Sequence, residues 1–274
     1  MPELPEVETV CRGLAAHLVK ARVAHVLVRR RDLRVPVPTH LEKAISGKTL
    51  ARIARRAKYI LFHFDDGQVL ITHLGMSGRM VLGTSAPKRY QKHDHVIIGW
   101  ADGHILIFND ARRFGLMVLT TESALAAHPL LKDLGPEPLA KEWNGAHLYE
   151  TLHASQAPVK SVIMDQRKLV GVGNIYACEA LFRAAIHPAR AASKVKENEA
   201  DRLAIAIRQV LEEAIISGGS TLRDYVRSSG DAGYFQHHFK VYGRHKLACF
   251  TCKTPIAMTR QAGRSTFFCK VCQK

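Results

Sequence analysis

Five short apolar runs between residues 59 and 120 constrain the fold more than any other feature of the chain. The runs are YILFHF (59–64), QVLITHL (68–74), HVIIGW (95–100), HILIF (104–108) and LMVLT (116–120). They are rich in β-branched and aromatic residues, which is typical of β-strands. Asp66-Gly67 and Asp102-Gly103 separate neighbouring runs, and Asp-Gly is a strong signal for a hairpin turn. The sequence therefore predicts antiparallel sheets, as a sandwich or barrel, over about residues 20–120.

A helix is predicted at the N-terminus. Apolar side chains recur there at helical spacing, namely Val7, Val10, Cys11, Leu14 and Leu18. Pro5 is tolerated in a first helical turn, and the acids Glu6 and Glu8 complement the helix dipole. This interpretation leaves Pro2 and Glu3 without a structural role.

The pattern changes after residue 128. Residues 128–145 (HPLLKDLGPEPLAKEWNG) contain three prolines and two glycines, which is typical of a connection between domains. Beyond it the period is helical, and Gly218-Gly219 would end a helix whose one face is lined by Leu203, Ile207, Val210, Leu211 and Ala214. A polar, glycine-containing stretch (SSGDAGYFQHH, 228–238) is predicted to be a loop. The fold class predicted for the whole chain is α+β.

The charge balance indicates an anionic partner. The chain has 40 Lys and Arg against 24 Asp and Glu, a formal net charge of +16. Such an excess favours binding to a polyanion, most often nucleic acid. A membrane surface is the competing partner, but we find no basic amphipathic helix and no apolar run of the roughly 18 residues that span a bilayer. The chain shows no signal peptide, so we expect the reducing cytoplasm.

Four cysteines near the C-terminus form a metal-binding pattern. Cys249, Cys252, Cys269 and Cys272 have the spacing C-x2-C-x16-C-x2-C, which holds four thiolates around zinc. An iron–sulfur cluster or two disulfides are the alternatives, and the spacing and the expected compartment disfavour both. Four protein ligands fill the coordination sphere, so the sequence predicts one structural Zn²⁺.

Four glycine-flanked or basic segments have two interpretations each. GVGN (171–174) predicts a tight turn opening a helix, either as a phosphate site or as an ordinary cap. RRAKY (55–59) and DARRFG (110–115) are basic-aromatic clusters, either a solvated face or contacts to phosphates and a groove. HLGMSG (73–78) places Met76 in a turn, although methionine is more often a core residue.

The ordered co-occurrence of eight motifs identifies a resemblance. The motifs are MPELPEVET (1–9), RRAKY, HLGMSG, DARRFG, LGPEPL (134–139), GVGNIYACEALF (171–182), GGSTLRDY (218–225) and the four-cysteine pattern. Together they resemble the bacterial formamidopyrimidine-DNA glycosylases, which remove 8-oxoguanine and ring-opened purines from DNA. The resemblance implies an N-terminal β-sandwich domain with flanking helices (1–130), an interdomain linker (131–150), a helical domain with a helix–two-turn–helix motif (151–240) and a zinc ribbon (241–274).

The resemblance also implies a chemical role for the first residues. Once Met1 is removed, Pro2 presents a secondary amine that is partly unprotonated near neutral pH. In the family this amine attacks C1′ of the damaged nucleotide, and the resulting Schiff base allows β,δ-elimination at the abasic site. Glu3 corresponds to the acid–base partner, and Glu6 to a supporting carboxylate. Lys58 and Arg264 join the catalytic residues, at phosphates around the lesion.

Further residues correspond to DNA-binding positions of the family. Met76, Arg112 and Phe114 match the trio that fills the space left by the flipped base. The remaining assignments are His73, Asn174 and Tyr242 to phosphates, Lys160 to the vicinity of the damaged base, and Ser220 and Thr221 to a loop that closes over it. The implied partner is damaged double-stranded DNA, bound by a monomer without a membrane, in the bacterial cytoplasm near the nucleoid.

Two rival functions remain at this point. The sister endonuclease VIII type shares Pro2, Glu3 and the ribbon but prefers oxidised pyrimidines, and its members lack the trio of Met76, Arg112 and Phe114. A non-catalytic nucleic-acid-binding protein would use only the ribbon and the basic strands. Such a protein would have no use for a processed Pro2 beside Glu3.

Overall fold

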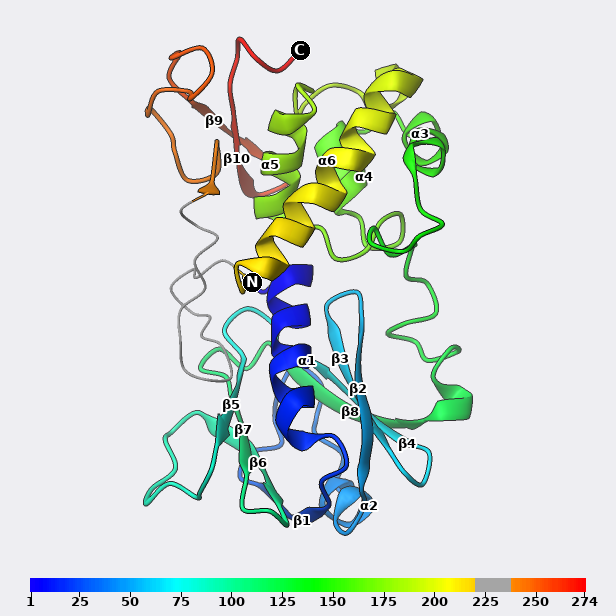
Figure 1. Ribbon diagram of the computed structural model, residues 1–274, viewed down its shortest axis with the longest axis vertical. Helices are drawn as coiled ribbons and strands as arrows, with labels where there is room; N and C mark the ends of the chain where they lie inside the picture. Colours follow the sequence, from blue (N-terminus) through cyan, green and yellow to red (C-terminus); the bar gives the residue numbers. More distant parts are fainter. Residues whose placement is uncertain (220–237) are drawn as a thin grey trace. The chain divides into compact units, whose positions relative to one another are not determined.

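The computed structural model describes residues 1–219 and 238–274. These residues form two compact units, the first made of 1–132 with 217–219 and the second of 133–216 with 238–274 (Figure 1). Within the described ranges, no helix has the length and apolar character needed to cross a membrane. The stretch predicted as a loop at 228–238 lies outside the described residues except for His238.

Two antiparallel four-stranded sheets build the first unit. Strand order in one sheet is β1-β6-β7-β5 and in the other β2-β3-β4-β8. The first sheet contains β1 (Val23–Val28), β6 (Asp94–Trp100), β7 (Ile105–Asn109) and β5 (Arg79–Gly83). The second contains β2 (Leu50–Arg56), β3 (Tyr59–Phe64), β4 (Gln68–His73) and β8 (Leu116–Thr121). All five apolar runs of the sequence form strands, and the predicted antiparallel pairing is confirmed.

Glycines in the left-handed region make both predicted hairpin turns. Gly67 has φ +81° between β3 and β4, and Gly103 has φ +94° between β6 and β7. The preceding aspartates support the turns, because Asp66 and Asp102 each accept a hydrogen bond from the backbone N–H two residues further on, at 3.1 Å. Both Asp-Gly turns thus join consecutive antiparallel strands, as predicted.

A long N-terminal helix packs against the sheets. Helix α1 (Leu4–Leu18) buries Val7, Val10, Leu14 and Leu18 in the core of this unit and lies beside β2 (Figure 1). Glu8 connects the two elements, since it accepts hydrogen bonds from Arg12 on the same helix and from Arg55 on β2. Burial raises the pKa of the Cys11 thiol to about 12, so Cys11 acts as a packing residue.

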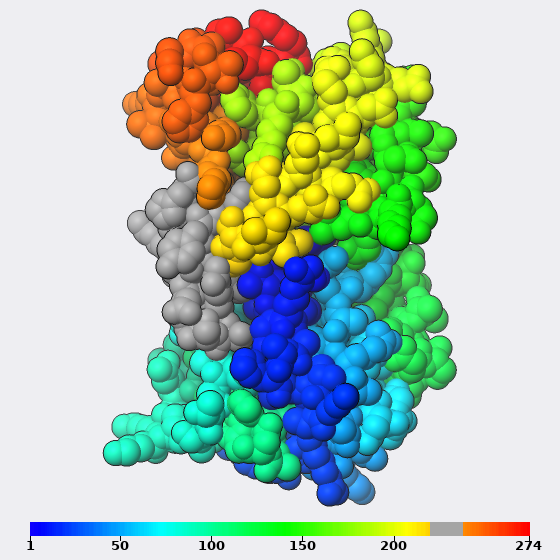
Figure 2. Space-filling model, viewed as in Figure 1, coloured from blue at the N-terminus to red at the C-terminus, as the bar shows by residue number. Residues whose placement is uncertain are grey.

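Short elements and one projecting loop complete the first unit. Helix α2 (Leu41–Ile45) lies next to β1, and the 3-10 helix η1 (Glu122–Ala124) follows β8. The loop that joins β5 to β6 projects into solvent (blue-green in Figure 2), and it exposes Lys88, Arg89 and Lys92.

Helices dominate the second unit. They are α3 (Gly145–His153), α4 (Val159–Met164), α5 (Asn174–Arg183), the 3-10 helix η2 (Ala192–Lys194) and α6 (Glu197–Ile216). Helix α5 is buried on all sides over Ile175–Leu181 and packs against α6. The hairpin of β9 (Ala257–Gln261) and β10 (Arg264–Phe268) follows. The predicted helix over 203–214 is part of α6, and Gly218 and Gly219 follow it with φ +75° and +83°.

Candidate functional site

The first residues of the chain form a buried acidic cap. Glu3 is the N-cap of α1 and is 3% exposed, and Pro2 is buried before it. Glu6, which is 2% exposed, accepts a hydrogen bond from the Glu3 backbone N–H at 2.9 Å. The helix-start role predicted for Pro5 and Glu6 is therefore present. The hydrogen bond to Glu6 also restrains the backbone of Glu3, the residue that directly follows Pro2.

The segment after α6 begins against this cap. A side-chain carbon on Gly219 would come within 3.3 Å of the Glu6 carboxylate oxygen Oε1, and Gly219 has φ +83°. Glycine is the residue suited to both the close approach and the left-handed backbone. The helix end predicted at Gly218-Gly219 is confirmed, and the contact with Glu6 adds a second reason for glycine there. Ser220 and Thr221, predicted to close over the lesion, lie outside the described residues.

Lys58 and His73 lie together at one end of the β2–β3–β4 meander. The turn before Lys58 is made by Ala57, whose φ is 53°, and Lys58 is buried. Burial, together with the charges of Lys58 and Arg34, lowers the pKa of His73 to about 4. His73 is therefore neutral near pH 7. Its Nδ1 accepts the Gly75 N–H at 2.9 Å, which leaves the proton on Nε2 as a donor suited to an anionic oxygen.

Met76, Arg112 and Phe114 gather on two touching segments. Met76 is 37% and Phe114 45% exposed, so neither is a core residue. The guanidinium carbon of Arg112 lies 4.7 Å from the centre of the Phe114 ring. Gly75 makes the close approach possible, because a side-chain carbon there would lie 2.4 Å from the Phe114 carbonyl carbon. The fold thus presents an exposed thioether, a guanidinium and an aromatic ring together.

Lys160 and Asn174 are joined in the second unit. The buried Lys160 ammonium donates to Asn174 Oδ1 at 2.5 Å and to Thr266 Oγ1 at 2.7 Å. Asn174 in turn donates to the carbonyl oxygen of Ser265 at 2.8 Å. These bonds connect α4, the start of α5 and β10. The GVGN turn is positioned by Gln166, which accepts the Gly171 N–H at 2.8 Å.

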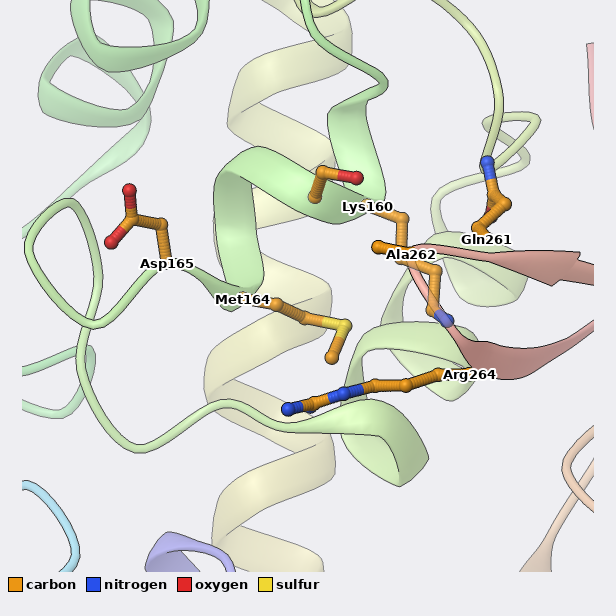
Figure 3. A pocket seen from close by; sticks show the side chains of 7 residues that line it. Lys160, Met164, Asp165, Gln261, Ala262 and Arg264 are labelled. Carbon is orange, nitrogen blue, oxygen red and sulfur yellow. The ribbon is translucent and has the colours of Figure 1, made fainter.

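A pocket of about 210 Å³ lies beside this junction. Its lining residues are Lys160, Ser161, Met164, Asp165, Gln261, Ala262 and Arg264 (Figure 3). Arg264 follows a tight turn in which Ala262 and Gly263 have φ 46° and 76°, and its exposed side chain extends toward Met164 (Figure 3). The lining therefore combines an exposed cation, Arg264, and a buried one, Lys160, with one carboxylate, Asp165, which is already paired with Arg167. This combination favours an anionic group.

Tyr242 is held by a residue that our sequence reasoning missed. Glu179 on α5 is 1% exposed and accepts backbone N–H groups of Lys240, Val241 and Tyr242 at 2.8–2.9 Å. The Tyr242 ring packs edge-on against Phe267, with centroids 5.1 Å apart. The sequence does contain a signal for this role, because Glu179 is the one acid in the otherwise mostly apolar stretch IYACEALF (175–182).

The four cysteines fit a zinc ion. Their Sγ atoms all lie within 4.8 Å of one another, with Cys249 and Cys272 3.9 Å apart and Cys252 and Cys269 3.4 Å apart. Tetrahedral Zn–S bonds of about 2.3 Å place sulfurs at roughly this separation. Four thiolates this close together repel one another, so a bound cation is what keeps all four groups deprotonated. The predicted structural zinc site is confirmed.

The metal site belongs to a small apolar cluster. Cys178 of α5 packs there with Val241, Cys249 and Ile256, so it is a packing residue, as is Cys11 in the other unit. Residues 238–274 contain eight Lys and Arg and no Asp or Glu. The ribbon and the turn that leads to it are therefore strongly basic and suited to a polyanion.

Three segments of the chain match known families. Residues 1–117 match the formamidopyrimidine-DNA glycosylase N-terminal domain, residues 134–226 its H2TH domain, and residues 247–274 a zinc finger found in FPG and IleRS. Formamidopyrimidine-DNA glycosylases of Thioalkalivibrio sulfidiphilus and Dinoroseobacter shibae are 50% and 46% identical to the chain, with both partners covered over their full length.

Solved structures agree with these matches. The Lactococcus lactis Fpg (MutM) protein, in a complex with DNA containing N7-benzyl-Fapy-dG, is 34% identical with a TM-score of 0.92 over the whole of both chains. The MutM (Fpg) protein of Thermus thermophilus is 38% identical with a TM-score of 0.89, over 99% of this chain and 98% of that one. Full-length identity near one half, a shared fold and the four-cysteine zinc site lead to one conclusion: the chain belongs to the formamidopyrimidine-DNA glycosylase family.

Proposed function

We propose that the protein is a base excision repair DNA glycosylase and abasic-site lyase. It removes 8-oxoguanine and formamidopyrimidines from duplex DNA and then cleaves the abasic site by β,δ-elimination. The observation that carries this proposal is the buried Glu3 next to Pro2 at the start of α1, in a chain of this family. The Glu3 carboxyl group also takes part in the capping box at the start of α1, and its burial next to Pro2 in the chain gives it in addition the placement that acid–base chemistry on an N-terminal amine requires.

Pro2 and Glu3 supply the chemistry. The Pro2 nitrogen, freed by removal of Met1, forms a bond to C1′ while the bond from C1′ to the base breaks, and the base leaves with that electron pair. The Pro2 nitrogen next gives up its N–H proton, which the departing base anion takes up. The lone pair regained on the nitrogen then opens the C1′–O4′ bond as Glu3 donates a proton to O4′. The resulting iminium carries its positive charge without an added proton, and it withdraws the electrons that expel the 3′ and then the 5′ phosphate.

The remaining site residues bind and orient the DNA. We assign Lys58, His73, Asn174, Tyr242 and Arg264 to phosphates around the lesion. The neutral Nε2–H of His73 suits such a contact, and so does the exposed Arg264 guanidinium. We assign Lys160 to the vicinity of the damaged base, Ser220 and Thr221 to the loop over it, and Met76, Arg112 and Phe114 to the vacated space.

The zinc ion serves the structure of the ribbon. Four cysteine ligands leave no open position, so the ion holds the β9–β10 hairpin together. We propose that the chain divides into a catalytic domain (1–130), a linker (131–150), a helical DNA-binding domain (151–240) and the zinc ribbon (241–274). We also propose that the protein acts as a monomer in the cytoplasm, on the DNA of the nucleoid.

Borohydride trapping tests the proposed function. Wild-type protein is incubated with duplexes that carry 8-oxoguanine, a formamidopyrimidine or an oxidised pyrimidine, in the presence of sodium borohydride. We expect a covalent protein–DNA adduct with both purine lesions and much less with the pyrimidine. Binding without trapping would identify a non-catalytic binder, and preferential trapping on the pyrimidine would identify an endonuclease VIII-type enzyme. Glu3→Gln is the matched variant, and it should bind DNA but release the base slowly.

A further inference from the structure

One buried carboxylate connects the two segments that carry Met76, Arg112 and Phe114. Asp110 is completely buried. Its Oδ1 accepts hydrogen bonds from the Ser77 hydroxyl at 2.6 Å and from the Arg112 backbone N–H at 3.2 Å. Its Oδ2 accepts the Gly115 N–H at 2.8 Å. A single side chain therefore fixes both ends of the loop 112–115 and the turn next to Met76.

Ser77, next to Met76, bonds to both Asp110 and Arg112 of the other segment. Its hydroxyl donates to Asp110 and accepts the Arg112 N–H at 3.2 Å, so Ser77, Asp110 and Arg112 form a closed set of bonds. The Asp110 backbone is fixed from the sheet as well. Its N–H donates to the carbonyl oxygen of His93 at 3.0 Å, and its own carbonyl oxygen lies 2.7 Å from Nε2 of the buried His95.

The loop is restrained from its far side as well. Arg113 has φ 57°, an unfavourable backbone for an arginine, and its guanidinium pairs with Asp32. The Arg34 N–H donates to the carbonyl oxygen of Gly115 at 3.2 Å. These contacts involve no DNA, so the conformation of the loop is set in the free protein.

We infer that Asp110 and Ser77 are positioning residues that hold Met76, Arg112 and Phe114 as one preformed wedge. The inference rests on the proposed function, in which these three side chains enter the space left by the flipped base. Loops that order only on binding lose conformational entropy at that moment, which weakens the bound state. Loops ordered in advance by Asp110 avoid this cost, so the orphaned base meets Arg112 in its final position.

The test compares Ser77→Ala with Ser77→Thr. Single-turnover base release is measured on duplexes with 8-oxoguanine opposite cytosine and opposite adenine. We expect Ser77→Ala to slow release opposite cytosine by about tenfold and to shrink the preference for cytosine over adenine. Ser77→Thr keeps the hydroxyl and should stay within about threefold of wild type on both measures. Ser123→Ala is the matched control, since Ser123 is exposed and its hydroxyl bonds to that of Thr121, which has no assigned role in the site.

A double-mutant comparison separates positioning from general weakening of the fold. If Ser77 acts through Arg112, then Ser77→Ala should change the cytosine preference less than twofold in an Arg112→Ala background. Asp110→Asn provides a second, independent variant, because its amide has one acceptor oxygen and cannot accept both the Gly115 N–H and the Arg112 N–H, which bond to different oxygens of Asp110. Its cytosine preference should shrink as well.

Three results would overturn the inference: unchanged preference in both Ser77→Ala and Asp110→Asn, equal loss in Ser77→Thr, or full additivity with Arg112→Ala. Wild-type protein that releases no base and gives no trapped adduct would instead refute the proposed function. An active wild type with unaffected variants refutes only the positioning role.

Discussion

Replacement of Glu179 by glutamine tests whether one buried carboxylate holds the turn that carries Tyr242. In the structure Glu179 Oε1 accepts two backbone N–H groups, those of Val241 and Tyr242, and Oε2 accepts that of Lys240. Glutamine retains one acceptor oxygen and brings an NH₂ group toward the other donors. At least one buried N–H then loses its partner, and the remaining bonds lose the charge that strengthens them.

The expected cost follows from these bonds. A hydrogen bond to a charged group contributes about 1.5–3 kcal/mol, and an unsatisfied buried donor costs about 1–3 kcal/mol. We therefore expect Glu179→Gln to lower the free energy of unfolding by about 2–4 kcal/mol, seen as a fall in Tm of roughly 5–10 °C for the zinc-loaded full chain. Calorimetry and urea unfolding measure this. Glu212→Gln, an exposed change on α6, is the matched control. A Glu179→Gln protein as stable as this control would refute the reasoning.

Three further outcomes are expected. Cys272→Ser should lose zinc and weaken DNA binding, because the ribbon has almost no core of its own; an active wild-type protein without zinc on metal analysis would contradict this. Arg264→Ala should reduce the slope of log affinity against log salt by about one, and an unchanged slope would remove Arg264 from the phosphate contacts. The folded-state pKa of His73, about 4, lies below the ordinary 6.5, so stability falls as pH drops through this window. Between pH 7.5 and 5 the free energy of unfolding of the wild type should fall by up to about 2 kcal/mol more than that of His73→Gln. Equal losses in urea unfolding would contradict a neutral, half-buried imidazole.

The central strands could be predicted from the sequence, and the polar edge strands could not be. Strands β3, β4, β6 and β7 are paired on both sides and bury most of their side chains, so they appear as continuous apolar runs. Strands β1, β2 and β5 are edge strands with partly exposed faces, and β2 carries three arginines (LARIARR). Their apolar pattern is correspondingly weak. They were covered only by the general expectation of strands over 20–120.

In the site, residue types with a distinctive pattern could be predicted, whereas buried supporting acids could not be. The cysteine spacing alone indicated the zinc site, and the resemblance pointed to Pro2 and Glu3. Asp110 and Glu179 were missed because a sequence does not tell which acids are buried, and their partners are mostly backbone N–H groups that carry no residue signature. The left-handed backbone of Arg113 could not be predicted either, because arginine has no preference for that conformation.

Peptide mapping of the borohydride-trapped complex tests the central claim most directly. The adduct formed with 8-oxoguanine DNA is digested, and the peptide that carries the sugar is identified by mass spectrometry. The proposed mechanism predicts the sugar on the peptide that begins at Pro2, with Met1 absent. Protein that retains Met1 should form no adduct, because the Pro2 nitrogen is then an amide whose lone pair is delocalised. A sugar on the Lys58 peptide, or full activity with Met1 in place, would contradict the account.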